Sequence, residues 1–492
     1  MTKRRTAMAN NVNDLRSAIE LLKEIPGQYM ETDKPVKVDA TVAGMYTKIG
    51  ARGTIKRPTK LGPMLVCNNV EGFPGARIAI GVLADRNRIG YLLDEDPEKL
   101  GHFYVKAYKN PIDPVVIPND QALCQEEVYL ASDPDFDLWK ILPAVKTTEK
   151  DGAQYVTMGL CYAHDPDDPT CGNATIHRMS IQGKDEMVVG FGGQRHIGAF
   201  KDKAFKKGEP LKMSVSIGID PAIYLASCFE PPTTPIGFDE LTIAGGMRGK
   251  PVELVKCRSI DEYAIANAEY VLEGELIPDK MLSEDSTTGT GHAIPEFHGY
   301  ESDARKQPVF KIKAVTCRHN PIFQMCIGAS EEHVNMSGLP TEATMMIQLG
   351  NAFPGFVKNA YCPPSGGGKL NVILQVSKKR PMDEGKQRQA AILALGVAPE
   401  LKNVILVDDD VDIFDPYDVE WALTTRFKPE MDLDYIRQVK GHMGDPVGKQ
   451  HYDPSLRANG LSTKAIYDAT VPFALKEKYV RATYMDVDIS DL

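Results

Sequence analysis

The chain of 492 residues has a formal net charge of −10 and 42% hydrophobic residues, the composition of an ordinary globular protein. Its length exceeds the size at which one hydrophobic core keeps growing, so we expect two or three domains. The lack of any run rich in Lys and Arg argues against nucleic acid or an anionic membrane surface as the main partner. The cysteines, 9 in all, include no Cys-x-x-Cys pair, which is typical of the reduced cytosol, and no stretch of about 18 apolar residues predicts a membrane span. We therefore expect a cytoplasmic protein.

The N-terminal segment, residues 1–130, is predicted to be mixed α/β. Asn13 and Asp14 precede four apolar residues at helical spacing, which predicts a capped amphipathic helix from Leu15 to Leu22. Short apolar runs at 64–67 and 77–83 then alternate with helical patterns, such as the one over 94–108. A cluster of prolines and an Asp-Pro pair between 111 and 134 indicates the end of this segment.

The middle segment, residues 131–325, reads as a mostly β domain with few helices. Many short strands separated by turn signals are typical of an antiparallel barrel or sandwich. The strand-like runs lie at 155–160, 174–181, 187–191, 212–219, 252–257, 269–276 and 309–317.

The C-terminal segment, residues 326–492, returns to α/β alternation. We predict strands at 371–376 and 403–407, the second of them apolar throughout as in buried parallel strands, and a helix over 383–395. An acidic run, Asp408 to Asp412, follows the second strand. Such a run is equally consistent with a Mg²⁺ site and with acids that cap the next helix.

Residues 173–196 form the densest polar stretch of the chain. Asn173, Arg178, Arg195 and His196 stand among alternating apolar residues and glycines, in two predicted strands that a polar turn joins. That geometry lets the basic side chains point into one cavity, although solvated surface strands are the alternative. Together with Glu240, Asn173 and His196 offer a carboxylate oxygen, an amide oxygen and an imidazole, a reasonable ligand set for Mn²⁺ or Mg²⁺ that also holds a phosphate.

A second polar cluster contains His292 and Glu296, where a carboxylate near an arginine could transfer a proton. His333, Lys369 and His442 are three more basic side chains in predicted loops. Familiar nucleotide and hydrolase motifs are absent: Leu370 follows Lys369, so Gly366-Gly-Gly-Lys369 is no P-loop, and the chain has no Gly-x-Gly-x-x-Gly, His-Glu-x-x-His or Gly-x-Ser-x-Gly in the required context.

These residues resemble the UbiD family of reversible decarboxylases, which use prenylated FMN. Within the family, Thr288-Gly-Thr-Gly-His-Ala-Ile-Pro-Glu296 and Ser330-Glu-Glu-His333 are most similar to decarboxylases of the gallate and protocatechuate (3,4-dihydroxybenzoate) type. The family motifs occur in order along nearly the whole chain: Asn173-x-x-x-His-Arg178, Arg195-His196, Glu240 before Ala-Gly-Gly-Met-Arg-Gly, Glu273-Gly-Glu-Leu, Pro-Glu296-Phe-His-Gly-Tyr300 and Val407-Asp-Asp-Asp-Val-Asp-Ile-Phe-Asp415.

The resemblance implies a fold and a set of ligands. The fold is a split β-barrel flavin-binding domain flanked by an N-terminal α/β segment and a C-terminal α/β oligomerisation domain. Mn²⁺ would be held by Asn173, His196 and Glu240, and K⁺ near Ala226 and Ser227. Prenylated FMN would be bound by Asn173, Ile176, His177, Arg178, Arg195, His196, Glu240 and Lys402.

The implied activity is the reversible, non-oxidative decarboxylation of a hydroxylated aromatic acid through a covalent adduct with prenylated FMN. An electrophilic cofactor is needed because the electrons left after loss of CO₂ occupy an orbital that the ring cannot delocalise. Arg178 would contact the flavin and pair with Glu296, the proton donor. The family often has another carboxylate five residues earlier; here that position is Gly291, so this carboxylate is expected to be missing and His292 to take over part of its role.

The resemblance also implies partners. The substrate, a small aromatic acid, would contact Arg195, His292, His333, Lys369 and His442, and CO₂ would be the other product or substrate. A flavin prenyltransferase would supply the cofactor, the chain would form a dimer or a hexamer, and a small accessory subunit could take part. The alternatives are a decarboxylase of an indole-, pyrrole- or furan-carboxylate, a carboxylase subunit of the same family, or an assembly subunit without cofactor.

Overall fold

The computed structural model describes residues 11–56, 60–191 and 196–488. The chain divides into two compact units, the first formed by Met1–Ile347 with Cys362–Asn371 and the second by Gln348–Tyr361 with Val372–Leu492. Helix α10 (Glu331–Ala352) contributes residues to both units. The three domains over 1–130, 131–325 and 326–492 stay a prediction.

The N-terminal part of the first unit contains a four-stranded sheet of order β1-β2-β3-β14, formed by β1 (Tyr29–Thr32), β2 (Met64–Cys67), β3 (Arg77–Ile80) and β14 (Ile322–Met325). The predicted first helix is confirmed as α2 (Leu15–Lys23), whose N-cap Asp14 accepts a hydrogen bond of 2.7 Å from the Ser17 N–H. Three more helices belong to this part: α3 (Thr41–Gly50), α4 (Arg86–Leu93) and α5 (Leu100–Lys109).

The helix predicted over 94–108 is wrong in its first turns. α4 ends at Leu93, its C-cap Asp94 has a left-handed φ of 53°, and Pro97 then opens a short 3₁₀ turn before α5 begins at Leu100. A proline has no N–H to donate, so it begins a helical segment more readily than it continues one.

A seven-stranded sheet of order β12-β9-β6-β7-β8-β13-β5 dominates the first unit, and the strands that the sequence predicts here are confirmed. Because β12 also pairs with β13, the six strands β12, β9, β6, β7, β8 and β13 form a closed hydrogen-bonded ring. The strands are β5 (Glu127–Leu130), β6 (Tyr155–Asp165), β7 (Asp168–Ile181), β8 (Glu186–Val189), β9 (Leu211–Ile217), β12 (Tyr270–Ser283) and β13 (Lys306–Cys317).

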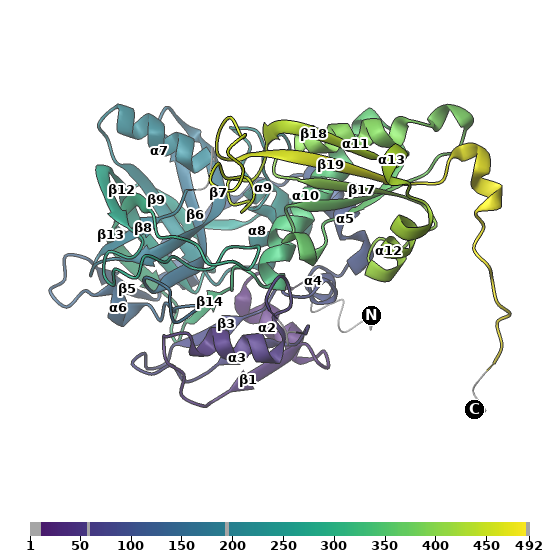
Figure 1. The fold of residues 1–492 in the computed structure, drawn as a ribbon. Helices are drawn as coiled ribbons and strands as arrows, with labels where there is room; N and C mark the ends of the chain where they lie inside the picture. Colours follow the sequence, from purple (N-terminus) through teal and green to yellow (C-terminus); the bar gives the residue numbers. More distant parts are fainter. Residues whose placement is uncertain (1–10, 57–59, 192–195, 489–492) are drawn as a thin grey trace. The chain divides into compact units, whose positions relative to one another are not determined.

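The middle segment holds more helices than the sequence predicts. Besides the one-turn α6 (Leu138–Ile141), it contains α7 (His196–Lys206), α8 (Pro221–Ala226) and α9 (Leu241–Arg248). Its strands β11 (Tyr263–Ile265) and β10 (Glu253–Lys256) form a three-stranded sheet with β4 (Val115–Ile117) of the N-terminal segment. α7 packs on β6, β7, β9 and β12 (Figure 1). The glycines of α9 suggest a loop, but they allow close packing: a Cβ at Gly246 would lie 2.6 Å from the carbonyl oxygen of Ala107 in α5.

The second unit is built on a five-stranded sheet of order β15-β16-β17-β19-β18. Both predicted strands are confirmed as β16 and β17, and the predicted helix is α11, which begins three residues later than expected, after a 3₁₀ turn at Pro381–Asp383. The elements are β15 (Val357–Tyr361), β16 (Asn371–Val376), β17 (Asn403–Asp408), β18 (Leu433–Lys440), β19 (Leu461–Ala469), α11 (Lys386–Val397), α12 (Pro416–Thr425) and α13 (Pro429–Asp432).

The acidic run after β17 is used for hydrogen bonds and ion pairs. Asp408 accepts a 2.7 Å hydrogen bond from the Val471 N–H, Asp410 pairs with Arg426 at 2.6 Å, and Asp415 caps α12. Among the described residues no group of three or more His, Cys, Asp and Glu side chains is arranged to hold a metal ion. Members of the run thus form hydrogen bonds and ion pairs, and the cap of the next helix is Asp415, three residues after the run.

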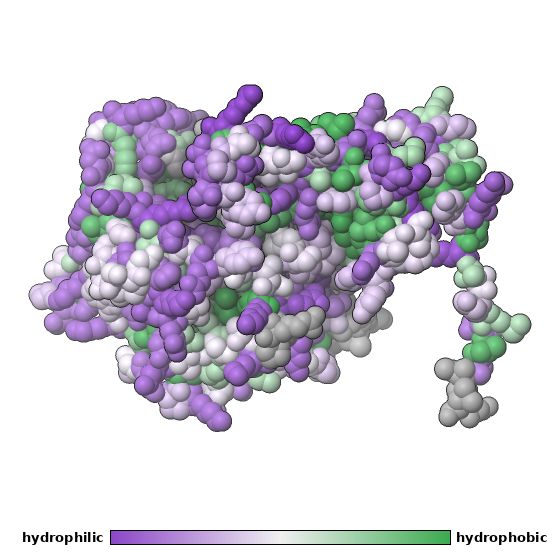
Figure 2. Space-filling model, in the orientation of Figure 1, coloured by the Kyte–Doolittle hydropathy of each residue, from purple (hydrophilic) through white to green (hydrophobic). Residues whose placement is uncertain are grey.

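Hydrophilic residues cover much of the face seen in Figure 2, with apolar residues scattered among them. Within the described ranges, no helix has the length and apolar character needed to cross a membrane.

Candidate active site

The centre of the site is Arg178 on β7, whose guanidinium binds two carboxylates at once. Nε and Nη2 donate to the two oxygens of Glu284 at 2.9 and 3.2 Å, and Nη1 donates to Oε1 of Glu296 at 3.0 Å. The side chain of Glu284 is 2% exposed, whereas those of Arg178 and Glu296 are 22% and 27% exposed. Burial opposes the charge of Arg178, but the two carboxylates outweigh it and raise its pKa.

Arg178 has a second carboxylate partner that the sequence prediction did not single out. Position 291 is Gly, so no carboxylate stands five residues before Glu296, but Glu284, directly after β12, binds the guanidinium. The loop between them folds back, since the carboxylate of Asp285 accepts a 2.7 Å hydrogen bond from the Gly291 N–H. The role expected of His292 stays a prediction; its Nδ1 lies 3.9 Å from Glu301.

Asn173, His196 and Glu240 converge as predicted, although they come from β7, the start of α7 and the N-cap of α9. Asn173 Nδ2 lies 2.9 Å from His196 Nδ1 and 2.8 Å from Glu240 Oε2, and all three side chains are buried. Burial, with the charge of Asp239 as the next cause, raises the pKa of Glu240 well above its usual range.

This triple fits a divalent metal ion. Asn173 Oδ1 is buried and has no hydrogen-bond partner among the described residues. The oxygen and nitrogen of a side-chain amide are assigned from their surroundings, so either orientation of the group is possible. Rotating the Asn173 amide by half a turn exchanges the two atoms and places Oδ1 where Glu240 and His196 meet. An amide oxygen, a carboxylate and an imidazole then face one point, and a cation there would offset the cost of burying Glu240.

We expect Mn²⁺ to stabilise the apo protein through this triple, by about 2.7 kcal/mol at 100 times the dissociation constant. Glu240→Gln should remove this effect, while the metal-free variant melts at or above the wild-type temperature because a buried charge is gone. Melting curves with and without Mn²⁺ measure both. Glu273, a fully buried carboxylate that accepts from the Arg258 and Ser259 N–H groups, provides the control: Glu273→Gln should lower the melting temperature but keep the Mn²⁺ response.

The remaining predicted flavin and K⁺ ligands, apart from Lys402, lie near these groups in sequence. Ile176 and His177 precede Arg178 on β7, and the His177 ring packs on Phe191 with centroids 4.7 Å apart. Ala226 ends α8, and Ser227 donates its hydroxyl to the Tyr224 carbonyl at 2.9 Å. Arg195 lies outside the described residues.

Two of the predicted substrate residues lie beside the Glu296 segment. The rings of His333, on α10, and Phe297 are perpendicular, with centroids 6.4 Å apart. The loop that carries Lys369 packs on the same phenyl ring, since a Cβ at Gly367 would lie 2.4 Å from Phe297. Lys369 Nζ is 3.5 Å from a carboxylate oxygen of Glu230.

Lys402, a predicted flavin ligand, and His442, a predicted substrate residue, belong to the second unit. Lys402 forms an ion pair with Asp445 at 3.0 Å, and His442 Nε2 lies 3.6 Å from Glu400. Their roles toward flavin and substrate stay predictions.

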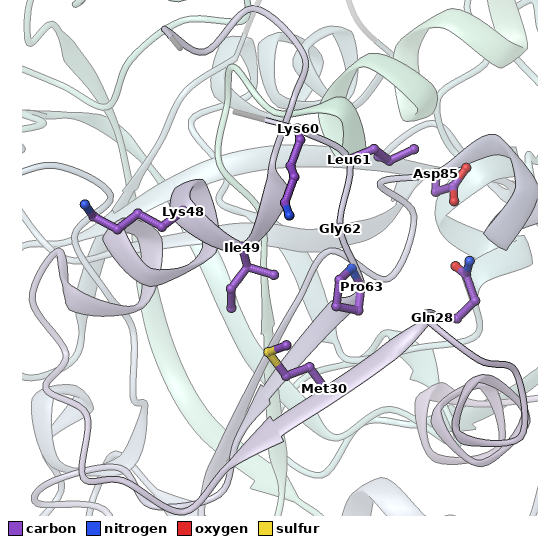
Figure 3. A pocket seen from close by; sticks show the side chains of 10 residues that line it. Gln28, Met30, Lys48, Ile49, Lys60, Leu61, Gly62, Pro63 and Asp85 are labelled. Atoms are coloured by element: carbon purple, nitrogen blue, oxygen red, sulfur yellow. The ribbon is translucent and has the colours of Figure 1, made fainter. Parts of the chain in front are cut away.

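A separate cavity of about 380 Å³ lies in the N-terminal part of the first unit and is lined by Gln28, Lys60, Gly62 and Asp85, among others. In Figure 3, Lys60 extends toward Ile49 and Pro63, whereas Lys48 extends away. None of the predicted site residues lines this cavity.

An arginine held between two carboxylates has the groups that acid–base chemistry requires, and the neighbouring ligand triple suits a metal ion. The chain matches the 3-octaprenyl-4-hydroxybenzoate carboxy-lyase Rift-related domain over residues 115–331 and the corresponding C-terminal domain over 334–469. It belongs to the UbiD family of decarboxylases.

The chain is similar to known proteins over nearly its whole length. It is 44% identical to the gallate decarboxylase of Lactiplantibacillus plantarum, with 98% of both chains covered. The apo structure of a 3,4-dihydroxybenzoic acid decarboxylase from Enterobacter cloacae is 49% identical, with a TM-score of 0.93 and 98% of both chains covered. The UbiD-class enzyme HmfF from Pelotomaculum thermopropionicum, solved in complex with prFMN, is 27% identical, with a TM-score of 0.82 over 97% of this chain and 99% of that one.

Proposed function

We propose that this chain is a prenylated-FMN-dependent decarboxylase of a hydroxylated benzoate of the gallate or 3,4-dihydroxybenzoate type. The observation that carries the proposal is the Arg178 guanidinium bound by both Glu284 and Glu296, because it joins a proton donor to a fixed cation. The similarity over the full chain to the gallate and 3,4-dihydroxybenzoic acid decarboxylases supports the substrate class.

In this proposal, the closed ring of strands in the first unit is the split β-barrel that binds the flavin, and the second unit serves oligomerisation. Asn173, His196 and Glu240 would hold Mn²⁺, and Ala226 and Ser227 would hold K⁺. The flavin, made by a flavin prenyltransferase, supplies the electron sink that loss of CO₂ from an aromatic ring requires.

The chain's own residues supply the proton. After CO₂ leaves, the carboxyl group of Glu296 donates a proton to the ring carbon that carried it, and Arg178 orients this carboxyl group by its 3.0 Å hydrogen bond. Glu284 holds the other side of the guanidinium, so that Arg178 keeps one orientation through the reaction.

The test is a panel of aromatic acids, with CO₂ release measured on protein co-expressed with a flavin prenyltransferase. Gallate and 3,4-dihydroxybenzoate should be the best substrates. Turnover of indole-, pyrrole- or furan-carboxylate alone would establish the heteroaromatic alternative, and activity only with added subunits would favour a carboxylase subunit or a need for the small accessory subunit. A protein whose absorption spectrum shows no bound flavin would be an assembly subunit.

Lys369→Ala should lower turnover of the dihydroxybenzoate more than that of benzoates with one hydroxyl. A cation that faces a ring hydroxyl favours the phenolate and so enriches the ring in electrons, which a substrate without that hydroxyl cannot exploit. Relative kcat/KM values across the panel measure the effect. The matched control is Lys358→Ala, a change at a lysine of β15 in the second unit, and equal losses on every substrate for Lys369→Ala would rule out this role.

A further inference from the structure

Three buried polar side chains, which we call the Tyr155 cluster, lie next to Glu284: Tyr155, Ser180 and Gln182. Tyr155 is paired with Ser180 across β6 and β7, and Gln182 follows β7. Tyr155 is 0%, Ser180 1% and Gln182 9% exposed. A cluster of polar groups in this position needs an explanation, because water cannot satisfy such groups from the outside.

Hydrogen bonds connect the cluster to the acid–base centre. Gln182 Nε2 lies 2.9 Å from Ser180 Oγ and donates to the main-chain oxygen of Glu284 at 2.6 Å. The side chain of Glu284 then binds Arg178, which binds Glu296. A displacement at Gln182 therefore moves the residue that fixes the guanidinium.

Two atoms of the cluster lack a hydrogen bond of good geometry within the described part of the chain: the hydroxyl of Tyr155, which interacts with the side chain of Ser180 without completing such a bond, and Oε1 of Gln182. One is a donor and the other an acceptor, and both are buried. Burial, followed by the negative charge of Glu284, raises the pKa of Tyr155, so that this hydroxyl keeps its proton. Buried donors and acceptors in native proteins nearly always find a partner, which is often an internal water molecule.

We propose that Tyr155 and Gln182 bind an internal water molecule and that the Tyr155 cluster is a positioning device for Glu284. The water accepts the Tyr155 O–H and donates to Gln182 Oε1, which leaves its second O–H for an oxygen of Ser180 or Glu284. These residues touch neither substrate nor cofactor. They act through Glu284 on the orientation of Arg178 and on the readiness of Glu296 to give up its proton, and this role rests on the proposed function.

The phenyl ring of Tyr155 packs with Ala153 and Ile294, the latter close in sequence to Glu296. Tyr155→Phe keeps this packing and removes only the hydroxyl. We expect kcat to fall by about tenfold, the size of effect that hydrogen-bonded supports of ligand residues have elsewhere, with KM unchanged and the acid limb of the pH–rate profile displaced. A merely structural hydroxyl would move neither the limb nor the ratio of kcat to KM.

The control is Tyr104→Phe. Tyr104 is also 0% exposed, and its hydroxyl likewise has no hydrogen bond among the described residues, but its ring packs on Phe229 and it belongs to no part of the acid–base centre. Its kcat and pH profile should equal those of the wild type. If Tyr155→Phe behaves in the same way as this control, the positioning role is overturned.

A high-resolution crystal structure of the wild-type apo protein tests the water directly. Density for one water within hydrogen-bond distance of both Tyr155 Oη and Gln182 Oε1 is the expected result, and a direct contact between the two side chains would overturn it. This measurement needs no substrate. A wild-type protein with the water in place but without activity on any aromatic acid would therefore refute the proposed function and leave the water site standing.

Discussion

Glu296→Gln is expected to lower the rate of CO₂ release by about 10²–10⁴-fold, the usual contribution of a general acid or base. The amide has the size of the carboxyl group and its oxygen can still accept from Arg178 Nη1, which lies 3.0 Å away in the wild type. The guanidinium therefore stays in place while the transferable proton is lost. Flavin content, read from the absorption spectrum, should equal that of the wild type, so the loss falls on chemistry and not on cofactor binding.

Glu301→Gln is the matched control. Glu301 lies in the same segment, its side chain is 52% exposed, and it forms a 2.6 Å ion pair with Lys150. We expect no change in its kcat or flavin content. Turnover by Glu296→Gln that equals this control would remove Glu296 from the proton transfer and point to Glu284 as the donor.

The local sequence was sufficient to predict those helices and strands that have a clear apolar run or a capping residue of their own. β2 and β16 have the predicted bounds because β2 is an apolar run between Pro63 and Asn68 and β16 centres on the apolar residues 372–374, and α2 has a capping Asp14 before its apolar stripe. α9 was missed because Gly245 and Gly246 are poor helix formers, and only the close approach of α5 and the segment after it explains them.

Some residues of the site could likewise be predicted from the sequence, and others could not. Asn173, His196 and Glu240 could be grouped from their residue types, since amide, imidazole and carboxylate form a recognisable ligand set. Glu284 could not, because nothing near it in sequence marks it and its partner Arg178 is 106 residues away. The sequence prediction relied on a spacing of five residues before Glu296. The loop between β12 and Gly291 folds back, so a carboxylate at a longer spacing also reaches Arg178.

Arg178→Leu is expected to lower the free energy of unfolding by about 3–5 kcal/mol, the usual cost of breaking a buried ion pair by removing one partner. The cost arises because Glu284, with a side chain only 2% exposed, loses its two hydrogen bonds to the guanidinium and stays charged in a poorly solvated place. Urea denaturation, followed through the transition of the first unit, measures it. Activity should vanish as well, since Glu296 loses the group that orients it.

The double variant Arg178→Leu with Glu284→Gln identifies the origin of this cost. Neutralising the stranded carboxylate should recover part of the lost stability, so the double variant should be more stable than Arg178→Leu alone. Lys280, whose side chain is 44% exposed and lies 2.6 Å from Glu186, gives the comparison for an exposed pair: Lys280→Leu should cost less than about 1 kcal/mol. Strictly additive effects in the double variant would mean that Arg178 stabilises the fold by its packing, and that the charge of Glu284 is tolerated without it.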